Sequence, residues 1–226
     1  MNKELMLDTG NLESIKKCLE IYPISGVTTN PTILRKEGDV DFFCRLEAIE
    51  KLLPEGNSLH VQVTALAAEA MVKEAQTLVK TFGAKVFVKV PVSGEGMKAI
   101  KVLVTEGINV TATAIYSSFQ GMMAAMAGAR YLAVYYNRME NIGVNPLSII
   151  KDLSSFLQGN ECKILAASFH NVRQLTDAYA NGACACTVSP DILDIGMHNA
   201  SIEDAVEVFH KDWNCIHGNN SITELL

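Results

Sequence analysis

Residues 86–92 have the sequence Val-Phe-Val-Lys-Val-Pro-Val, a run of β-branched and aromatic residues with a single charge at Lys89. Its length and composition predict a buried β-strand. Similar runs recur along the chain, and stretches with helical apolar spacing separate them. The eight runs are residues 5–8, 26–29, 59–63, 86–91, 110–114, 132–136, 164–168 and 186–189.

Strands that alternate with helices indicate βαβ units and a parallel sheet. Eight such units, with no Pro-, Gly- or Ser-rich linker between them, predict an α/β protein in which residues 1–226 form a single-domain (β/α)8 TIM barrel. Residues 201–213 predict one additional C-terminal helix, with Ser201 as its N-cap and Asp204 in its first turn.

The composition argues against several functional classes. The net charge is −6 and the basic residues are scattered, so we expect no nucleic-acid partner. No apolar stretch approaches the ~18 residues of a membrane span, so we expect no membrane partner. The apolar run at residues 5–7 is too short for a signal-peptide core, which predicts a cytoplasmic protein. Six cysteines, of which only Cys184 and Cys186 are close in sequence, and five scattered histidines predict neither disulfides nor a metal site. No cofactor motif is present, since residues 94–96 lack the third glycine of a dinucleotide fingerprint.

Polar residues recur near the carboxyl ends of the predicted strands, on the face opposite the Val- and Leu-rich one. Residues two apart share a face of a strand, so seven of the eight strands are predicted to present a polar side chain to the barrel interior. Active sites of such barrels lie at this end. One polar residue could be a satisfied core group, but a ring of them favours a functional site. The ring comprises Asp8, Thr28, Asn30, Gln62, Lys89, Thr113, Tyr135 and Ser168.

Lys89 is the centre of the predicted chemistry. Burial disfavours an ammonium ion and lowers the pKa of a lysine by up to ~3–5 units, which leaves a lone pair that can attack a ketone or aldehyde to form an imine. The iminium can then withdraw electrons from a neighbouring C–C bond. The structural alternative is a lysine paired with Asp8 that serves only the fold.

The neighbours of Lys89 suggest how protons move. Asp8, the one carboxylate of the ring, could stabilise the protonated amine or position substrate. Gln62 and Thr113 can orient a water molecule, at which Tyr135 is a natural proton donor and acceptor.

The segment 166–173 ends a strand and opens a helix, where free backbone N–H groups favour a phosphate. Arg138, just past the sixth strand, could clamp the same anion. The structural alternatives are a solvated arginine at Arg138 and an N-cap at Ser168.

Several of these stretches resemble the transaldolase family, and within it the small fructose-6-phosphate aldolase branch. Residues 26–32, Gly-Val-Thr-Thr-Asn-Pro-Thr, resemble the family signature, and residues 88–96, Val-Lys-Val-Pro-Val-Ser-Gly-Glu-Gly, resemble its Schiff-base lysine motif. The resemblance extends from residues 7–9 through 137–138 and 166–169 to the terminal helix with Trp213.

The resemblance implies a class I aldol mechanism with the imine on Lys89 and with Asp8, Thr28 and Asn30 beside it. In the family, Glu at position 62 and Phe at position 135 mark transaldolases, whereas Gln62, Thr113 and Tyr135 mark aldolases that hold a catalytic water. Arg138, Ser168 and Arg173 match the family's substrate-binding positions, and His170 stands at a further one, where it departs from the pattern. The family usually has Lys or Arg at position 170, and a neutral imidazole attracts a dianion less strongly. The small branch forms ring pentamers and decamers, which implies a homo-oligomer with contacts through residues 201–226.

Three functions follow as hypotheses. The first is an aldolase that reversibly cleaves fructose 6-phosphate, or a close analogue, to dihydroxyacetone and glyceraldehyde 3-phosphate. The second is a transaldolase of the pentose phosphate pathway, which passes the same three-carbon unit to another aldose phosphate. The third is a barrel that binds sugar phosphates without catalysis.

Overall fold

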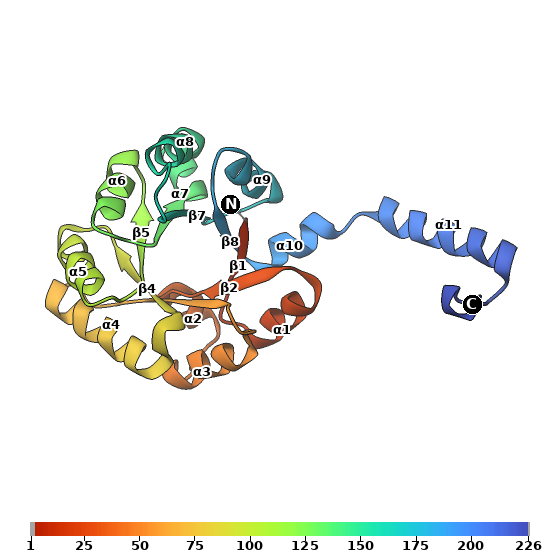
Figure 1. Ribbon diagram of the computed structural model, residues 1–226, viewed down its shortest axis with the longest axis horizontal. Helices are drawn as coiled ribbons and strands as arrows, with labels where there is room; N and C mark the ends of the chain where they lie inside the picture. Colours follow the sequence, from red (N-terminus) through yellow and green to blue (C-terminus); the bar gives the residue numbers. More distant parts are fainter. Residues whose placement is uncertain (1–2, 226) are drawn as a thin grey trace.

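Eight parallel strands close into a barrel in the computed structural model, which describes residues 3–225 (Figure 1). Each strand pairs with the next along the chain, and β8 pairs with β1. The (β/α)8 barrel predicted from the sequence is therefore confirmed. The strands are β1 (Glu4–Asp8), β2 (Ile24–Thr28), β3 (Ser58–Gln62), β4 (Val86–Pro91), β5 (Val110–Ile115), β6 (Tyr131–Tyr135), β7 (Lys163–Ala167) and β8 (Ala185–Val188).

Helices surround the barrel as an outer layer (Figure 1). The helix-facing side chains of the strands are apolar, among them Leu7, Val61 and Val88, and they pack with the helices in one core. The α-helices are α1 (Leu12–Ile21), α2 (Pro31–Lys36), α3 (Phe42–Leu52), α4 (Ala68–Phe82), α5 (Gly94–Thr105), α6 (Ser118–Met126), α7 (Tyr136–Asn141), α8 (Pro146–Phe156), α9 (Val172–Ala180), α10 (Pro190–Met197) and α11 (Ala200–His217). Two short 3₁₀ helices are η1 (Gly83–Lys85) and η2 (Ile222–Glu224).

The turn after β4 explains the glycine of the 88–96 motif. Ser93 is the N-cap of α5, and its hydroxyl accepts a hydrogen bond from Gly96 N at 3.0 Å. A Cβ atom at position 96 would lie 1.8 Å from Pro91 O, so a side chain there would collide with the strand. Gly96 therefore allows α5 to begin directly against the end of the strand that carries Lys89.

The register of the seventh strand differs from the prediction. Ala166 packs in the helix-facing core, whereas Leu165 packs inside the barrel with Met6 and Tyr131. Ser168 lies beyond β7 with φ 63°, so the alternation of the strand does not extend to it. Ser168 therefore belongs to the turn after β7, and its predicted place on the interior face of that strand was wrong.

A polar cluster closes the amino end of the barrel. Glu4 is ion-paired with Lys163 and accepts a hydrogen bond from Tyr131 Oη at 2.7 Å. Its backbone carbonyl accepts from Tyr179 Oη at 2.6 Å. Strands β1, β6 and β7 are thereby tied together beneath the apolar interior.

Replacing Glu4 by Ala should lower the free energy of unfolding by about 2–3 kcal/mol, because Lys163 and the Tyr131 hydroxyl would lose their partner in a half-buried site. Glu161→Ala provides the control, since its ion pair with Arg130 is exposed, with side chains 83% and 51% accessible. We expect a loss below about 1 kcal/mol there. Urea unfolding of both variants measures the difference, and equal losses would contradict the structural role given to Glu4.

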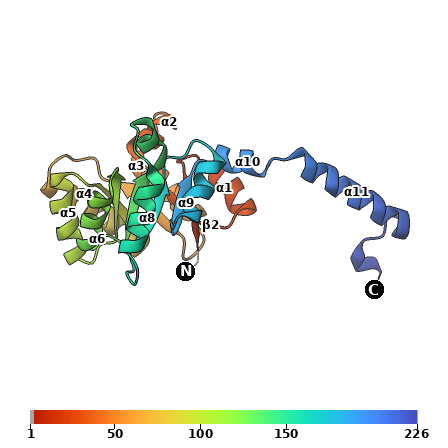
Figure 2. The same ribbon diagram turned by 90° about the horizontal axis from the view of Figure 1, so that it is seen from above.

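The C-terminal helix α11 projects away from the barrel (Figures 1 and 2). None of its residues is buried, and its exposed side chains include Ile202, Val206, Phe209 and Ile216. The predicted helix exists, but its N-cap is Asn199, whose Oδ1 accepts a hydrogen bond from Ser201 N at 3.0 Å. The assignment of Ser201 as the cap was therefore wrong, since an asparagine two residues earlier serves equally well.

Within residues 3–225, no helix has both the length and the apolar character needed to cross a bilayer.

Candidate active site

Lys89 lies inside the barrel near the carboxyl end of β4 and is 4% exposed. Its Nζ donates a hydrogen bond to the backbone carbonyl of Thr29 at 2.8 Å. Burial lowers the pKa of Lys89, and the negative charge of Asp8 partly opposes that shift. The amine is thus bonded to a neutral carbonyl, and its charged form is disfavoured in the way that nucleophilic attack on a carbonyl carbon requires.

The Asp8 carboxylate is bonded to a threonine hydroxyl. Its Oδ1 accepts from Thr28 Oγ1 at 2.6 Å, and Thr28 Oγ1 lies 2.7 Å from Thr187 Oγ1. The structural alternative in which Lys89 and Asp8 form a bonded pair is therefore not what the fold adopts. Thr187 on β8 was not among the residues predicted from the sequence.

Gln62, Thr113 and Tyr135 lie on β3, β5 and β6, around the end of β4 that carries Lys89. Thr113 Oγ1 and Tyr135 Oη are 3.0 Å apart, and Gln62 pairs with Lys89 in the register of the sheet. The Oε1 atom of Gln62 is buried and has no hydrogen-bond partner within residues 3–225. Buried amide oxygens are ordinarily bonded, so this atom is an acceptor available to a small polar molecule.

Tyr135 is held as a protonated phenol. Burial raises its pKa, against the opposing effects of the Thr113 hydrogen bond and the charge of Arg138. The Arg138 guanidinium carbon lies 4.7 Å from the centre of the Tyr135 ring, which is a cation–π distance. Tyr135 therefore offers a hydroxyl proton at neutral pH, next to a fixed positive charge.

A β-bulge precedes the end of β5. Ala112 pairs with Leu132 and Ile115 with Val134, so β5 has one residue more than β6 over this stretch. Ala114 within it has φ 60°, a left-handed conformation that is uncommon for alanine. Such bulges redirect neighbouring side chains, and this one accompanies the approach of Thr113 to Tyr135.

The predicted anion-binding residues divide into two groups. Arg138 on α7 and Ser168 after β7 are brought together, because Asn137 N donates to Ser168 O at 3.0 Å. His170 follows Ser168 and is exposed. Arg173 is 83% exposed and donates through Nε to both carboxylate oxygens of Asp177, at 2.9 and 2.8 Å. The structure thus directs Arg173 along the surface of α9 and does not bring it to the other three.

Asn30 follows the strand that supplies Thr28 and Thr29. It is the N-cap of α2, and its Oδ1 accepts from Ile33 N at 3.0 Å. The cap uses the oxygen of the half-buried side chain and leaves its amide group as a donor.

The comparisons with known proteins agree with this arrangement. The sequence pattern of the family described as Transaldolase/Fructose-6-phosphate aldolase matches residues 5–225. The chain belongs to the transaldolase/fructose-6-phosphate aldolase family. A protein of Streptococcus pneumoniae (strain ATCC 700669 / Spain 23F-1), named probable fructose-6-phosphate aldolase, is 45% identical over 221 residues, which cover 97% of this chain and 100% of the relative.

Membership of the transaldolase/fructose-6-phosphate aldolase family confirms the resemblance stated from the motifs. It also confirms that the chain is an enzyme of aldolase or transaldolase type.

The barrel interior also contains a buried histidine, His60, which lies two residues before Gln62 on β3. His60 is fully buried, and its ring nitrogens lie 2.9 Å from Ser58 Oγ and 2.8 Å from Thr111 Oγ1. The ring stacks on Phe87 with 4.7 Å between centroids. Burial, together with the charge of Lys89, lowers the pKa of His60 to about 3. His60 is therefore a neutral group beneath the site at physiological pH.

His60 should make stability depend on pH. The pKa of His60 is about 3 in the folded chain, and its ordinary value is 6.5. Between these two values the imidazole is protonated in the unfolded chain and neutral in the folded chain. The contribution is complete above pH 6.5 and is lost as pH falls toward 3, by about 5 kcal/mol. Urea unfolding of wild type and His60→Gln between pH 7 and about pH 4 tests this, since the variant should show a shallower loss. Parallel curves would disprove the assignment.

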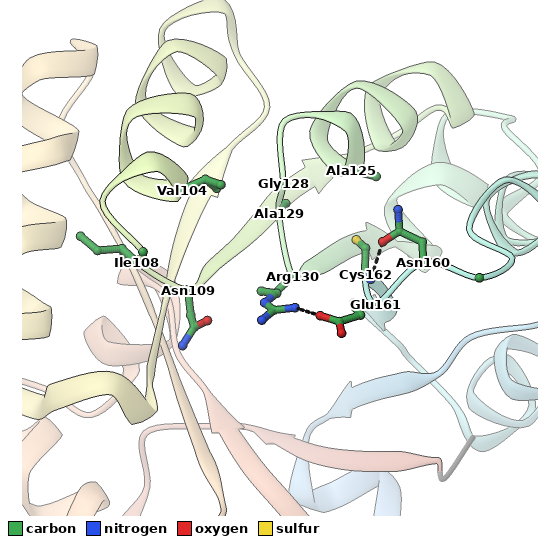
Figure 3. Close-up of a pocket in the computed structure, with 12 residues that line it drawn as sticks. Val104, Ile108, Asn109, Ala125, Gly128, Ala129, Arg130, Asn160, Glu161 and Cys162 are labelled. Carbon is green, nitrogen blue, oxygen red and sulfur yellow. Dashed lines mark hydrogen bonds and ion pairs between the residues drawn. The ribbon is translucent and has the colours of Figure 1, made fainter.

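A depression of about 550 Å³ lies at the amino end of the barrel, opposite the Lys89 end. It is lined by the segments that precede β5, β6 and β7 (Figure 3). Figure 3 shows Arg130 and Glu161 ion-paired there and Asn160 bonded to Cys162. Active sites of (β/α)8 barrels lie at the carboxyl ends of the strands. We therefore assign the chemistry to the Lys89 end and not to this depression at the amino end.

Proposed function

We propose that this enzyme is a class I aldolase that reversibly cleaves fructose 6-phosphate, or a close analogue, into dihydroxyacetone and glyceraldehyde 3-phosphate. The observation that carries the proposal is the buried Lys89 amine, bonded to the Thr29 carbonyl and surrounded by polar groups from the neighbouring strands. Family membership and the name of the Streptococcus pneumoniae relative support the same reaction.

Lys89 is the proposed nucleophile. Its lone pair attacks the ketone carbon, and loss of water from the carbinolamine gives an iminium ion. The bond between C3 and C4 then breaks and its electron pair moves toward the iminium nitrogen. The proton of the C4 hydroxyl passes to the water held beside Tyr135, from which a proton is later returned to the enamine carbon. Glyceraldehyde 3-phosphate departs, and a dihydroxyacetone enamine stays on Lys89.

Asp8 and Asn30 are the proposed substrate-binding groups in this step. Asp8, oriented by Thr28, accepts hydrogen bonds from substrate hydroxyls, and its charge stabilises the iminium. The Asn30 amide donates to the same part of the substrate.

The remaining half-reaction returns a proton to the enamine carbon and adds water to the imine. We assign the water to the space between Gln62, Thr113 and Tyr135, because the Gln62 Oε1 acceptor is buried and unpaired within residues 3–225. Tyr135, protonated and 3.0 Å from Thr113 Oγ1, hands a proton to this water or to the enamine. Dihydroxyacetone then leaves as a free ketone, which is the aldolase outcome.

The phosphate of the substrate is assigned to Arg138, Ser168 and His170. Arg138 supplies a fixed positive charge, and Ser168 is tied to the same helix by the Asn137 N to Ser168 O hydrogen bond. Arg173 is left out of the assignment because its guanidinium is engaged by Asp177.

Borohydride trapping tests the proposal. Incubation with dihydroxyacetone and borohydride should add the reduced three-carbon unit to the peptide that contains Lys89. Release of glyceraldehyde 3-phosphate from fructose 6-phosphate should proceed without erythrose 4-phosphate. Release that requires erythrose 4-phosphate would establish the transaldolase, and absence of both adduct and release would leave a binding barrel.

We also propose that residues 1–226 form one domain and that α11 with its tail mediates homo-oligomer contacts. The support is the exposed apolar surface of α11, which includes Ile202, Val206 and Phe209. Sedimentation of wild type and of a chain truncated after Asn199 tests it, since the truncated chain should form a smaller particle. Equal masses would refute the proposal. The pentamer or decamer implied by resemblance and the cytoplasmic location stay predictions.

A further inference from the structure

Two neighbouring barrel units, β6 with α7 and β7 with α9, are joined through Gln174. This residue lies in the first turn of α9 and is 7% exposed. Its Nε2 donates to Asn137 Oδ1 at 3.0 Å and to Glu140 Oε2, both on α7. Its Oε1 accepts from the backbone N–H of His170 at 2.7 Å. The side-chain amide therefore uses both donor hydrogens and its oxygen, which fixes its orientation.

These hydrogen bonds connect the segments that carry the proposed phosphate-binding residues. Arg138 lies between the two residues of α7 that Gln174 contacts, and His170 is the residue whose backbone it holds. The backbone bond from Asn137 N to Ser168 O adds a second link between the same segments. Gln174 thus sets the position of Arg138 relative to residues 168–170.

The same contacts decide which groups are left to recognise an anion. A loop that leads from a strand into a helix ordinarily offers its free backbone N–H groups to a phosphate. Here Gln174 Oε1 accepts the hydrogen bond of the His170 N–H, and Asn171 Oδ1 accepts that of the Gln174 N–H at 3.0 Å. These two bonds hold the loop in place, and they leave the side chains of Arg138, Ser168 and His170 to contact the anion.

We propose that Gln174 is a positioning residue that determines the preference of the enzyme for phosphorylated aldehydes. It acts by holding α7 and the loop 168–170 in one fixed arrangement, which places the Arg138 charge and the Ser168 hydroxyl on the same anion. The inference rests on the proposed function. Positioning of this kind raises affinity because the binding groups need no further ordering.

The β5–α6 loop offers an internal control. Gln120 Oε1 accepts from the backbone N–H of Tyr116 at 2.8 Å, the same four-residue spacing as in the His170–Gln174 pair. Ser117 caps α6 as Asn171 caps α9. Among the described residues, however, Gln120 forms no side-chain bond to a neighbouring barrel unit. Gln120 therefore shares the local role of Gln174 and lacks the link between units.

The test measures kcat/KM for addition of dihydroxyacetone to glyceraldehyde 3-phosphate and to unphosphorylated glyceraldehyde. In Gln174→Met, the ratio of the two values should fall by about 10-fold or more, while kcat/KM for glyceraldehyde changes less than about 3-fold. In Gln120→Met the ratio should stay at the wild-type value. Should Gln174→Met fail to fold, Gln174→Asn replaces it, because the shorter amide adds no charge and does not span from α9 to both partners on α7.

An unchanged ratio in the Gln174 variant, or an equal loss with both aldehydes, would overturn the inference and leave Gln174 with a purely structural role. Failure of the proposed function has a different signature. In that case wild type itself would add dihydroxyacetone to neither aldehyde, which would overturn the function and this inference together.

Discussion

Replacement of Lys89 by Met should abolish imine formation and reduce aldol cleavage at least ~10³-fold, because the nucleophile is removed and, among residues 3–225, no other lysine is buried. The thioether chain fills most of the same space, so the barrel should fold. Borohydride reduction in the presence of dihydroxyacetone, followed by peptide mass analysis, measures the adduct, and a coupled assay for glyceraldehyde 3-phosphate measures cleavage. An adduct that persists in the variant would place the imine on another lysine.

The same variant separates catalysis from stability. Burial lowers the pKa of Lys89 in the folded chain below its ordinary value of 10.5. Between the lowered value and 10.5 the unfolded chain binds more protons, so the stability of wild type rises with pH in that window. Lys89→Met lacks this rise, and its stability relative to wild type should therefore decline as pH approaches 10.5. Lys85→Met serves as the control, because the Lys85 side chain is 46% exposed and pairs with Glu50 at the surface.

Replacement of Tyr135 by Phe should convert the enzyme toward transaldolase behaviour. The ring and its contact with Arg138 are retained, whereas the hydroxyl that serves the enamine and the water is lost. Release of free dihydroxyacetone should fall by about 10²-fold or more, the usual contribution of a general acid or base. Transfer of the three-carbon unit to erythrose 4-phosphate should be reduced less, because an aldehyde acceptor consumes the enamine without that proton.

The measurement compares glyceraldehyde 3-phosphate formation from fructose 6-phosphate with and without erythrose 4-phosphate. Tyr116→Phe is the matched control, since Tyr116 lies 5.7 Å from the Tyr135 ring and its aromatic contact survives the substitution. Equal loss of release and transfer in Tyr135→Phe would mean that the hydroxyl serves a step common to both reactions.

Much of the fold could be predicted from local pattern. The runs at 86–91 and 110–114 correspond closely to β4 and β5, because alternation along a strand is visible in consecutive residues. The boundaries of β6 and β8 were off by one residue, since hydrogen bonding to neighbouring strands decides where a strand begins. The helix 201–213 extends to Ala200–His217, and its true cap is Asn199.

The candidate site could be predicted only in part. Lys89, Gln62, Thr113 and Tyr135 were identified because each occupies an interior position near the end of its own strand. Thr187 lay on the shortest strand, Ala185–Val188, where the alternation has few positions to reveal it. Arg173 matched the family's substrate-binding pattern, but its guanidinium is ion-paired with Asp177 one helical turn away.

The sequence by itself determined the eight strands, the interior position of Lys89 and the family, because periodicity and contiguous motifs depend on residues that are neighbours in the chain. Only the tertiary structure decided that the Lys89 amine bonds to Thr29, 60 residues away, and that Gln174 links Asn137 to His170. Such partners are chosen by closure of the barrel, which brings the carboxyl ends of distant strands to one edge. The choice among several competing donors and acceptors at that edge depends on distances and angles that no local pattern contains.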